Sequence, residues 1–213
     1  MTDQTNKSIL TRRRVLQLIA ASGAASSMGA YSLIGASAST DSAANTGYGP
    51  DPDLNNPQIP WGKSLSAGQL QAVTVLGDLI IPADAHSPKA SDLDIADFVN
   101  EWLSAPYPQQ QADRNVVLTG LRWLDQQAQT AGHQIFIKSP DKIQAKIFDQ
   151  LATAVATESA SEAQAEFFNK IVFLFVGGFY TTQEGMKDIG YVGNVPLQKF
   201  EGPPPEIRRR LGV

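Results

Sequence analysis

The chain has 213 residues, which is enough for one compact domain with additional terminal segments. Hydrophobic residues make up 42% and charged residues 18%, a balance that allows a buried core and argues against a wholly disordered protein. The absence of cysteine excludes disulfides, thiolate metal sites, covalent haem attachment and cysteine nucleophiles, and two histidines leave little material for histidine-based catalysis.

The N-terminus has the order of an export signal. Arginines 12–14 precede a weakly apolar stretch rich in Ala, Gly and Ser, and the stretch ends at an A-x-A cleavage pattern formed by Ala36 and Ala38. The pair Arg12 and Arg13 resembles the twin-arginine signal, which sends folded proteins across the bacterial inner membrane. We therefore predict a signal peptide over residues 1–38. An uncleaved membrane anchor is the alternative, although a span needs about 20 predominantly apolar residues.

The charge of the remaining chain excludes another class of partner. The leader holds four of the 17 basic residues and one of the 21 acidic residues, so residues 39–213 carry 13 and 20, a net charge of −7. An acidic body is a poor match for nucleic acid. The sequence also contains no glycine-rich phosphate loop, so we expect no nucleotide cofactor in this chain.

The first predicted elements follow a Pro-, Gly- and Ser-rich linker over residues 39–63. Ser66 and Gln69 form a capping pattern that predicts a helix continuing to Pro82. A second helix is expected to start near Ser91 or Asp92 and to end before Pro106. Its predicted buried residues are Ile95, Phe98, Val99 and Trp102.

Three more helices are predicted before residue 181. One follows Pro108, buries the stripe Val117, Leu121, Leu124 and Ala128, and stops at Gly132. The next has Ser139 as its cap and Pro140 as its first residue. The last begins at Ser161 and is apolar on all sides over residues 167–176, which indicates a central helix, with a buried strand as the alternative.

The predicted fold is mainly α: a compact bundle of about five helices over residues 64–180, followed by an irregular Gly- and Pro-rich strap over residues 181–213. The strap keeps aromatic and branched residues at intervals. Such residues suggest a segment that lies on a surface, either that of its own bundle or that of another protein.

Five segments together carry a family resemblance. They are residues 76–84 (LGDLIIPAD), 98–103 (FVNEWL), 178–181 (GFYT), 188–196 (DIGYVGNVP) and 200–204 (FEGPP). Each segment alone is weak, but their order and the GYxGN turn are specific. The chain from about residue 65 to its end resembles the small subunit, or subunit 3, of gluconate 2-dehydrogenase, with a twin-arginine leader in front as expected for that family.

The resemblance implies a non-catalytic subunit in a complex. Members of the family accompany a large FAD-containing flavoprotein of the glucose–methanol–choline type, which oxidises a sugar or sugar acid, and often a multihaem cytochrome c. The large subunit commonly lacks a leader and is carried out with the small one by the twin-arginine translocase. The resemblance therefore predicts a maturation and co-export partner in the periplasm, at the outer face of the inner membrane. The alternative is an independent periplasmic protein that binds a ligand along its apolar helix.

The candidate site residues are docking residues, because no catalytic, cofactor or metal set is visible. Where the resemblance is concentrated we expect contact with the large subunit through Phe175, Gly178, Phe179, Tyr180, Gly190, Tyr191, Gly193, Asn194, Pro196 and Phe200. Metal binding is a second interpretation of the cluster Asp84, His86, Asp92, Asp94 and Asp97. These residues are more simply explained as solvated side chains and helix-start charges.

Overall fold

The computed structural model describes residue 55 and residues 58–191, 193, 199, 202, 203 and 205–212. The predicted export-signal residues Arg12, Arg13, Ala36 and Ala38 lie outside this part of the chain, as do the predicted docking residues Asn194, Pro196 and Phe200. The described residues form helices and no strand, which confirms the mainly α prediction.

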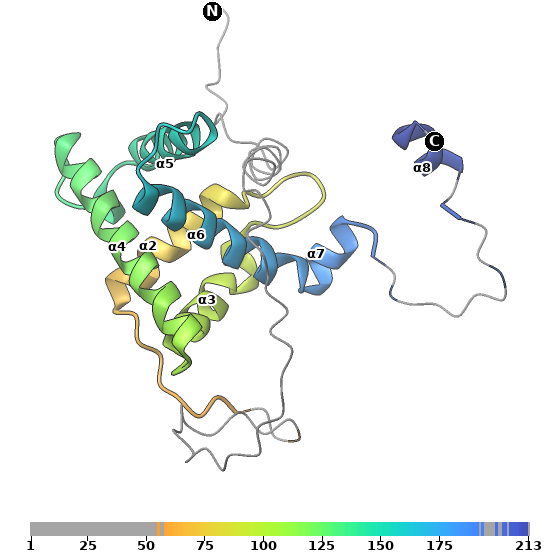
Figure 1. Ribbon diagram of the computed structural model, residues 1–213, viewed down its shortest axis with the longest axis horizontal. Coiled ribbons are helices and arrows are strands. Elements are labelled where there is room, and N and C mark those ends of the chain that lie inside the picture. The colour runs from red at the N-terminus through yellow and green to blue at the C-terminus, as the bar shows by residue number, and fades with distance from the viewer. Residues whose placement is uncertain are drawn as a thin grey trace, which may run out of the picture.

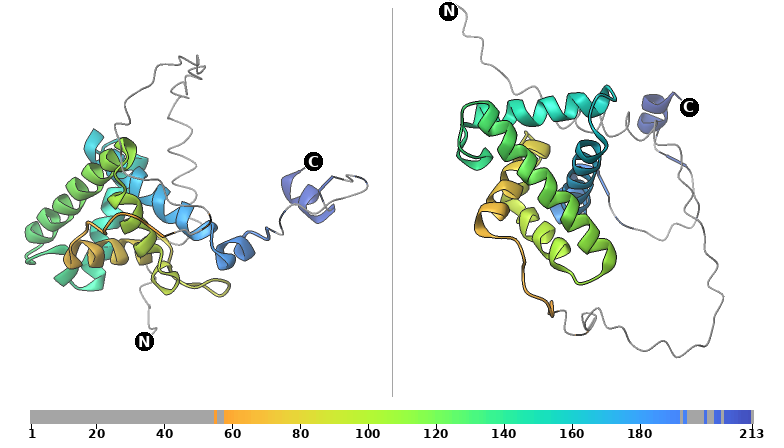
Figure 2. Two further views of the ribbon diagram at one scale, coloured as in Figure 1. Left: turned by 90° about the horizontal axis from the view of Figure 1, so that it is seen from below. Right: turned by 60° about the vertical axis from the view of Figure 1, so that its left-hand side comes forward.

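Helices α2, α3, α4 and α5 form a bundle around the central helix α6 (Figures 1 and 2). Helix α6 contacts α2, α3, α4, α5 and α7, so the apolar run over residues 167–176 is the helical centre of the fold and not a strand. The elements are α2 (Ala67–Ile80), the 3-10 turn η1 (Ala90–Leu93), α3 (Ile95–Ser104), α4 (Pro108–Thr130), the 3-10 turn η2 (Phe136–Lys138), α5 (Asp141–Ala156), α6 (Glu162–Tyr180), α7 (Gln183–Asp188) and α8 (Pro205–Leu211).

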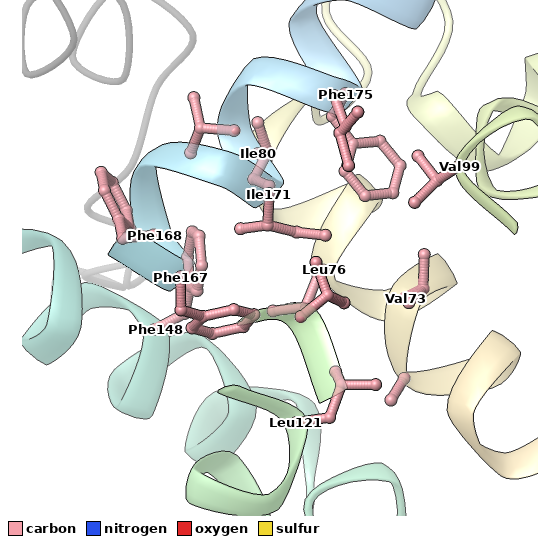
Figure 3. Packing of buried hydrophobic residues seen from close by; sticks show 14 of the residues in the cluster. Val73, Leu76, Ile80, Val99, Leu121, Phe148, Phe167, Phe168, Ile171 and Phe175 are labelled. Carbon is pink, nitrogen blue, oxygen red and sulfur yellow. The ribbon is translucent and has the colours of Figure 1, made fainter. Parts of the chain in front are cut away.

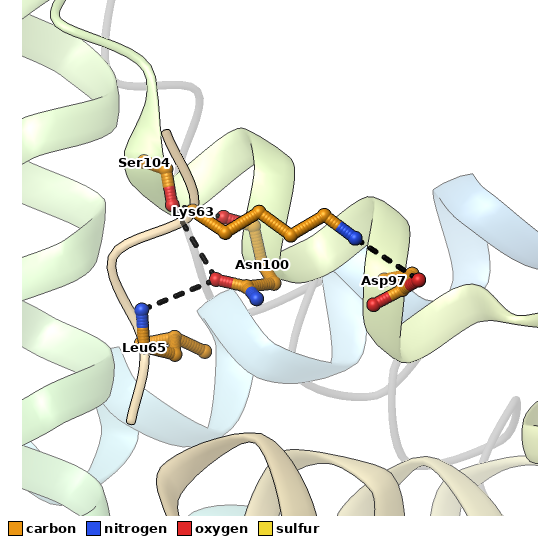
Figure 4. A network of polar contacts seen from close by, with 5 residues as sticks. All are labelled: Lys63, Leu65, Asp97, Asn100 and Ser104. Carbon is orange, nitrogen blue, oxygen red and sulfur yellow. Dashed lines mark hydrogen bonds and ion pairs between the residues drawn. The ribbon is translucent and has the colours of Figure 1, made fainter. Parts of the chain in front are cut away.

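The segment before α2 is tied to α3 by polar contacts (Figure 4). The backbone N–H of Leu65 donates to the side-chain oxygen of the buried Asn100 at 3.3 Å, and the Ser104 hydroxyl donates to the Asn100 carbonyl at 2.6 Å. Lys63 forms an ion pair with Asp97 at 3.0 Å. These contacts fix the chain where it enters the bundle.

Helix α2 begins as the sequence predicts. The Ser66 side chain accepts from the Gln69 backbone N–H, and the Gln69 side chain accepts from the Ser66 N–H, which completes the capping box. Val73, Leu76 and Ile80 are then buried at helical spacing.

The predicted start of the second helix, near Ser91 or Asp92, was wrong by three to four residues, since α3 begins at Ile95. Residues 90–93 form the 3-10 turn η1 instead, because the carboxylate of Asp78 on α2 accepts from the Ser91 backbone N–H at 2.9 Å and from the Lys89 ammonium at 2.8 Å. Asp94 follows with a φ of 53°, which breaks the helical run before Ile95 opens α3. Phe98, predicted to be buried, is 38% exposed.

Helix α4 confirms the third prediction, since its stripe Val117, Leu121, Leu124 and Ala128 is buried and its end is followed by Gly132 at a φ of 83°. Where α4 crosses α6, a Cβ on Gly120 would overlap the ring of Phe167. A glycine at this position therefore allows the two helices to approach closely.

The predicted cap of α5 was wrong. Pro140 occupies the N-cap position, and the helix begins at Asp141. The buried Ser139 hydroxyl donates to the Ile135 carbonyl at 3.1 Å, so it closes the preceding turn and does not cap the helix. By contrast, Ser161 and Gln164 form the predicted capping box of α6.

The core lies between α6 and the helices that surround it. Phe167, Ile171 and Phe175 of α6 are at most 1% exposed, and Figure 3 places them beside Leu76 of α2 and Phe148 of α5. Within residues 181–213 the structure describes two short helices, α7 and α8, of six and seven residues. Their brevity agrees with the Gly and Pro content of this segment.

Candidate docking site

One face of the central helix remains open to solvent. Phe173 of α6 is 65% exposed, although its neighbours Val172 and Leu174 are buried. Gly177 lies one turn further along, is also exposed, and has no neighbouring atom within 4 Å of the position that a Cβ would take. A large exposed aromatic side chain next to open backbone is a feature of surfaces that meet another protein.

A second exposed aromatic residue comes from α3. The ring of Phe98 covers Gly178 of α6, where a Cβ would lie 2.9 Å from that ring and 2.9 Å from the Ile95 side chain. Gly178 is therefore required for the contact between α3 and α6. The ring of Phe98 also lies 6.3 Å from that of the half-buried Trp102, centroid to centroid.

A series of contacts connects Phe173 of α6 to Trp102 and Phe98 of α3. The Lys170 ammonium lies 5.9 Å from the centre of the Phe173 ring and 2.8 Å from the Asp113 carboxylate on α4. The other oxygen of Asp113 accepts from the Trp102 indole at 3.0 Å. We call the surface formed by Phe98, Trp102, Lys170, Phe173 and Gly177 the aromatic patch.

Asp113 is the charged anchor beneath the aromatic patch. Its side chain is 3% exposed, and besides Lys170 and Trp102 the Gln109 amide donates to it at 2.9 Å. Burial alone raises the pKa of this carboxyl, but the hydrogen bonds from Lys170, Trp102 and Gln109 and the charge of Lys170 outweigh burial, so the pKa lies below its ordinary value. The carboxylate is charged at neutral pH and holds three helices in register.

The end of α6 continues into a second exposed region. Helix α7 is tied to the loop after α2 by a 2.8 Å hydrogen bond from the Ser87 hydroxyl to Asp188. Gly190 has a φ of 67° and ends α7, with the Tyr191 N–H donating to the Met186 carbonyl at 2.8 Å, an arrangement typical of helix C-termini that end in glycine. The side chain of Tyr191 is 55% exposed beyond this turn.

The structure separates the predicted docking residues into two groups. Phe175, Gly178 and Phe179 lie in the core of this chain, so we do not retain them as direct partner contacts. Tyr180 is half-buried, whereas Gly190, Tyr191 and Gly193 are exposed.

Sequence reasoning missed the exposure of Phe98 and Phe173. The exposure of Phe173 could have been predicted from its position on the helix. On a helical projection it lies opposite the buried face formed by Ile171 and Phe175, which marks it as the outward member of the apolar run.

The acidic cluster between α2 and α3 has structural roles. The Asp84 carboxylate accepts from the backbone N–H groups of His86 and Ser87 at 2.8 and 2.9 Å, and Asp97 pairs with Lys63. Among the residues that the structure describes, no group of three or more His, Cys, Asp or Glu side chains is placed to hold a metal ion.

A groove of about 970 Å³ lies on another part of the bundle, between α5 and the end of α2. None of its lining residues belongs to α6, but a smaller cavity of about 230 Å³ is lined in part by Ala163, Gln164 and Phe167 of α6, so the alternative of a ligand pocket along that helix stays a prediction. Among the described helices, none is both long enough and apolar enough to cross a membrane.

Comparison with known proteins gives one match. No curated protein and no solved structure matches the chain. The family model described as gluconate 2-dehydrogenase subunit 3 matches residues 67–202, which extend from the first residue of α2 into the tail and include the aromatic patch. The chain therefore belongs to the gluconate 2-dehydrogenase subunit 3 family, whose name identifies its members as subunits of a larger dehydrogenase complex.

Proposed function

We propose that this chain is a non-catalytic subunit that binds a large FAD-containing dehydrogenase of the glucose–methanol–choline type and accompanies it through maturation and twin-arginine export to the periplasm. The substrate class is a sugar or sugar acid. A multihaem cytochrome c is the proposed electron acceptor of the complex. Family membership supports the subunit role, and the leader over residues 1–38 supports the export role.

The observation that carries the proposal is the aromatic patch. Phe173 is 65% exposed on a helix that is otherwise the centre of the core, and leaving so large an apolar side chain in water forgoes about 1.5–3 kcal/mol of burial free energy. The patch is held rigidly, because Lys170 and Trp102 both bond the buried Asp113. A rigid aromatic surface loses little entropy on binding, which suits a contact with another subunit.

The exposed end of the chain provides a second contact region in this proposal. Tyr191 and Ile189 are 55% and 60% exposed directly after α7. Tyrosine combines a large apolar ring with a hydrogen-bonding hydroxyl, a combination that is enriched at protein interfaces. The tail therefore extends the docking surface beyond α6.

The test is a binding measurement with matched variants. Phe173→Ser and Glu166→Ser both change an exposed residue of α6, and neither removes a core contact. If Phe173 anchors the large subunit, its loss should weaken binding by about 2 kcal/mol, or roughly 30-fold in Kd, whereas Glu166→Ser should leave Kd within about threefold. Equal Kd values for the two variants, with unchanged thermal unfolding, would refute the role of the aromatic patch.

The export role is tested separately. Replacing both leader arginines, Arg12→Lys with Arg13→Lys, should keep this chain and the large subunit in the cytoplasm, because the twin-arginine pair is the transport address. The readout is the dehydrogenase activity and the amount of both proteins in periplasmic and cytoplasmic fractions. Periplasmic activity at the level of the unaltered chain would overturn the export role.

A further inference from the structure

The groove between α5 and the end of α2 has the form of a helix-length docking seam. On α5 its lining residues recur three and four positions apart over nearly the whole helix: Asp141, Lys142, Ala145, Lys146, Asp149, Gln150, Thr153 and Ala154. A helix of 16 residues is about 24 Å long, so the seam extends for several turns. Leu79 and Pro82 at the end of α2 form the facing wall.

The seam accepts close approach of another segment. Ala145 and Ala154 are small, and they lie among the half-buried residues of α5. The two alanines lie nine residues apart, at opposite margins of the lining stripe, and each leaves room at its margin of the groove. Most of the wall area is apolar, and the charged lining residues are Asp78, Asp141 and Asp149 against two lysines, with Asp78 already paired with Lys89 at 2.8 Å.

We propose that this groove binds the chain's own leader, residues 11–35, before export. The composition of the leader suits the groove, since the leader combines apolar residues such as Leu16 and Ile19 with many small Ala and Gly residues. It also complements the charge of the body. Residues 1–38 carry four basic residues and one acid, whereas residues 39–213 carry a net charge of −7.

The linker is long enough for this contact. Residues 39–57 connect the leader to Gln58, and 19 extended residues span up to roughly 60 Å at about 3.3 Å per residue. A domain of about 130 residues has a radius of gyration of roughly 14 Å. The leader can therefore reach the groove from any point at which the chain enters the bundle.

Docking would protect the apolar leader from water while the precursor is in the cytoplasm. The groove and the translocase would also compete for the leader. The folded domain would therefore influence when export begins. The inference rests on the proposed export function only for the identity of the leader, because the contact itself is intramolecular and needs neither the translocase nor the large subunit.

The absence of native cysteine allows a direct test in the full-length chain. The pair Ile19→Cys with Ala145→Cys should form an intramolecular disulfide under mild oxidation. The matched control, Ile19→Cys with Ala112→Cys, uses an exposed alanine of α4 that does not line the groove. We expect the groove pair to cross-link at least about tenfold faster than the control pair, at a rate independent of protein concentration.

A second measurement avoids the cysteine variants. Hydrogen exchange over residues 141–156 should be slower in the full-length chain than in a variant with Leu16, Leu18 and Ile19 all changed to Ser. Equal cross-linking of the two pairs, cross-linking only between molecules, or equal exchange in the two chains would overturn the inference. None of these results depends on export, so the outcome is separate from that of the arginine-pair experiment.

Discussion

Removing the charge of Asp113 should lower the free energy of unfolding more than breaking an exposed ion pair does. The carboxylate is 3% exposed and accepts from the Lys170 ammonium at 2.8 Å, the Gln109 amide at 2.9 Å and the Trp102 indole at 3.0 Å. In Asp113→Asn, the new amide group presents N–H donors to a site that already holds three donors, so at least one partner loses its acceptor.

The magnitude follows from the burial of the pair. Breaking a buried ion pair from one side costs about 3–5 kcal/mol. The Lys170 side chain is 24% exposed, so its ammonium can regain water, and the asparagine carbonyl still accepts one hydrogen bond. We therefore expect a loss of about 2–4 kcal/mol in the free energy of unfolding, measured by urea titration at pH 7.

The exposed pair Lys63 and Asp97 supplies the control. The side chains of this pair are 50% and 54% exposed, so Asp97→Asn should cost at most about 1 kcal/mol. A loss below about 1 kcal/mol for Asp113→Asn, or equal losses for the two variants, would refute the argument that the buried network supports the fold.

The pH dependence gives an independent check on the same residue. The folded-state pKa of Asp113 lies below its ordinary value of 3.8, so the folded chain binds a proton at this site less readily than the unfolded chain does. The stabilisation is therefore complete well above pH 3.8 and is lost as the pH falls through and below that value. The difference between the unaltered chain and Asp113→Asn should shrink on acidification from pH 6 to pH 3, and a constant difference would contradict this account.

Three further substitutions test local features. Gly120→Ala should destabilise the chain by about 1–3 kcal/mol in urea titration, because the added methyl group overlaps the Phe167 ring, and unchanged stability would contradict the described helix crossing. Ser161→Ala should cost about 1 kcal/mol in the same assay, because the Gln164 N–H loses its acceptor; a cost near zero would argue against the capping box. Gly185→Ala places a Cβ against the Phe179 carbonyl and should speed hydrogen exchange over residues 183–190, whereas unchanged exchange would show that α7 tolerates the methyl group.

The sequence predicts the helices well where side-chain chemistry is local. The capping boxes at Ser66 and Ser161 and the buried stripe of α4 depend on residues three or four positions apart, and the structure confirms all of them. The two failures have different causes: the Ser139 hydroxyl donates to the nearby Ile135 carbonyl and does not cap α5, whereas the start of the second helix is changed by a contact between elements. The Asp78 carboxylate accepts from the backbone N–H and the hydroxyl of Ser91, and residues 90–93 form a 3-10 turn; no local sequence pattern encodes this contact between elements.

The candidate site was harder to predict than the fold. An apolar run predicts burial on every side of a helix. The helices that pack around α6 decide which side of it stays exposed, and their arrangement is a property of the tertiary structure. Phe173 is therefore exposed and Phe175 is buried, although both lie in the same run of hydrophobic residues. The export signal, the location and the partners stay predictions, because they concern residues or molecules outside the described structure.

The glycine contacts of the bundle have a consequence for how its sequence can change. Gly77 faces the Phe175 ring, Gly120 faces the Phe167 ring, and Gly178 faces Phe98. At each of these positions a ring fills the volume that a methyl group would need. The two members of a pair are therefore expected to covary across natural variants: a larger residue in place of the glycine should appear together with a smaller residue in place of the ring. The pairs thus form reciprocal size constraints, and a Gly120→Ala chain should regain stability when Phe167 is also shortened to leucine.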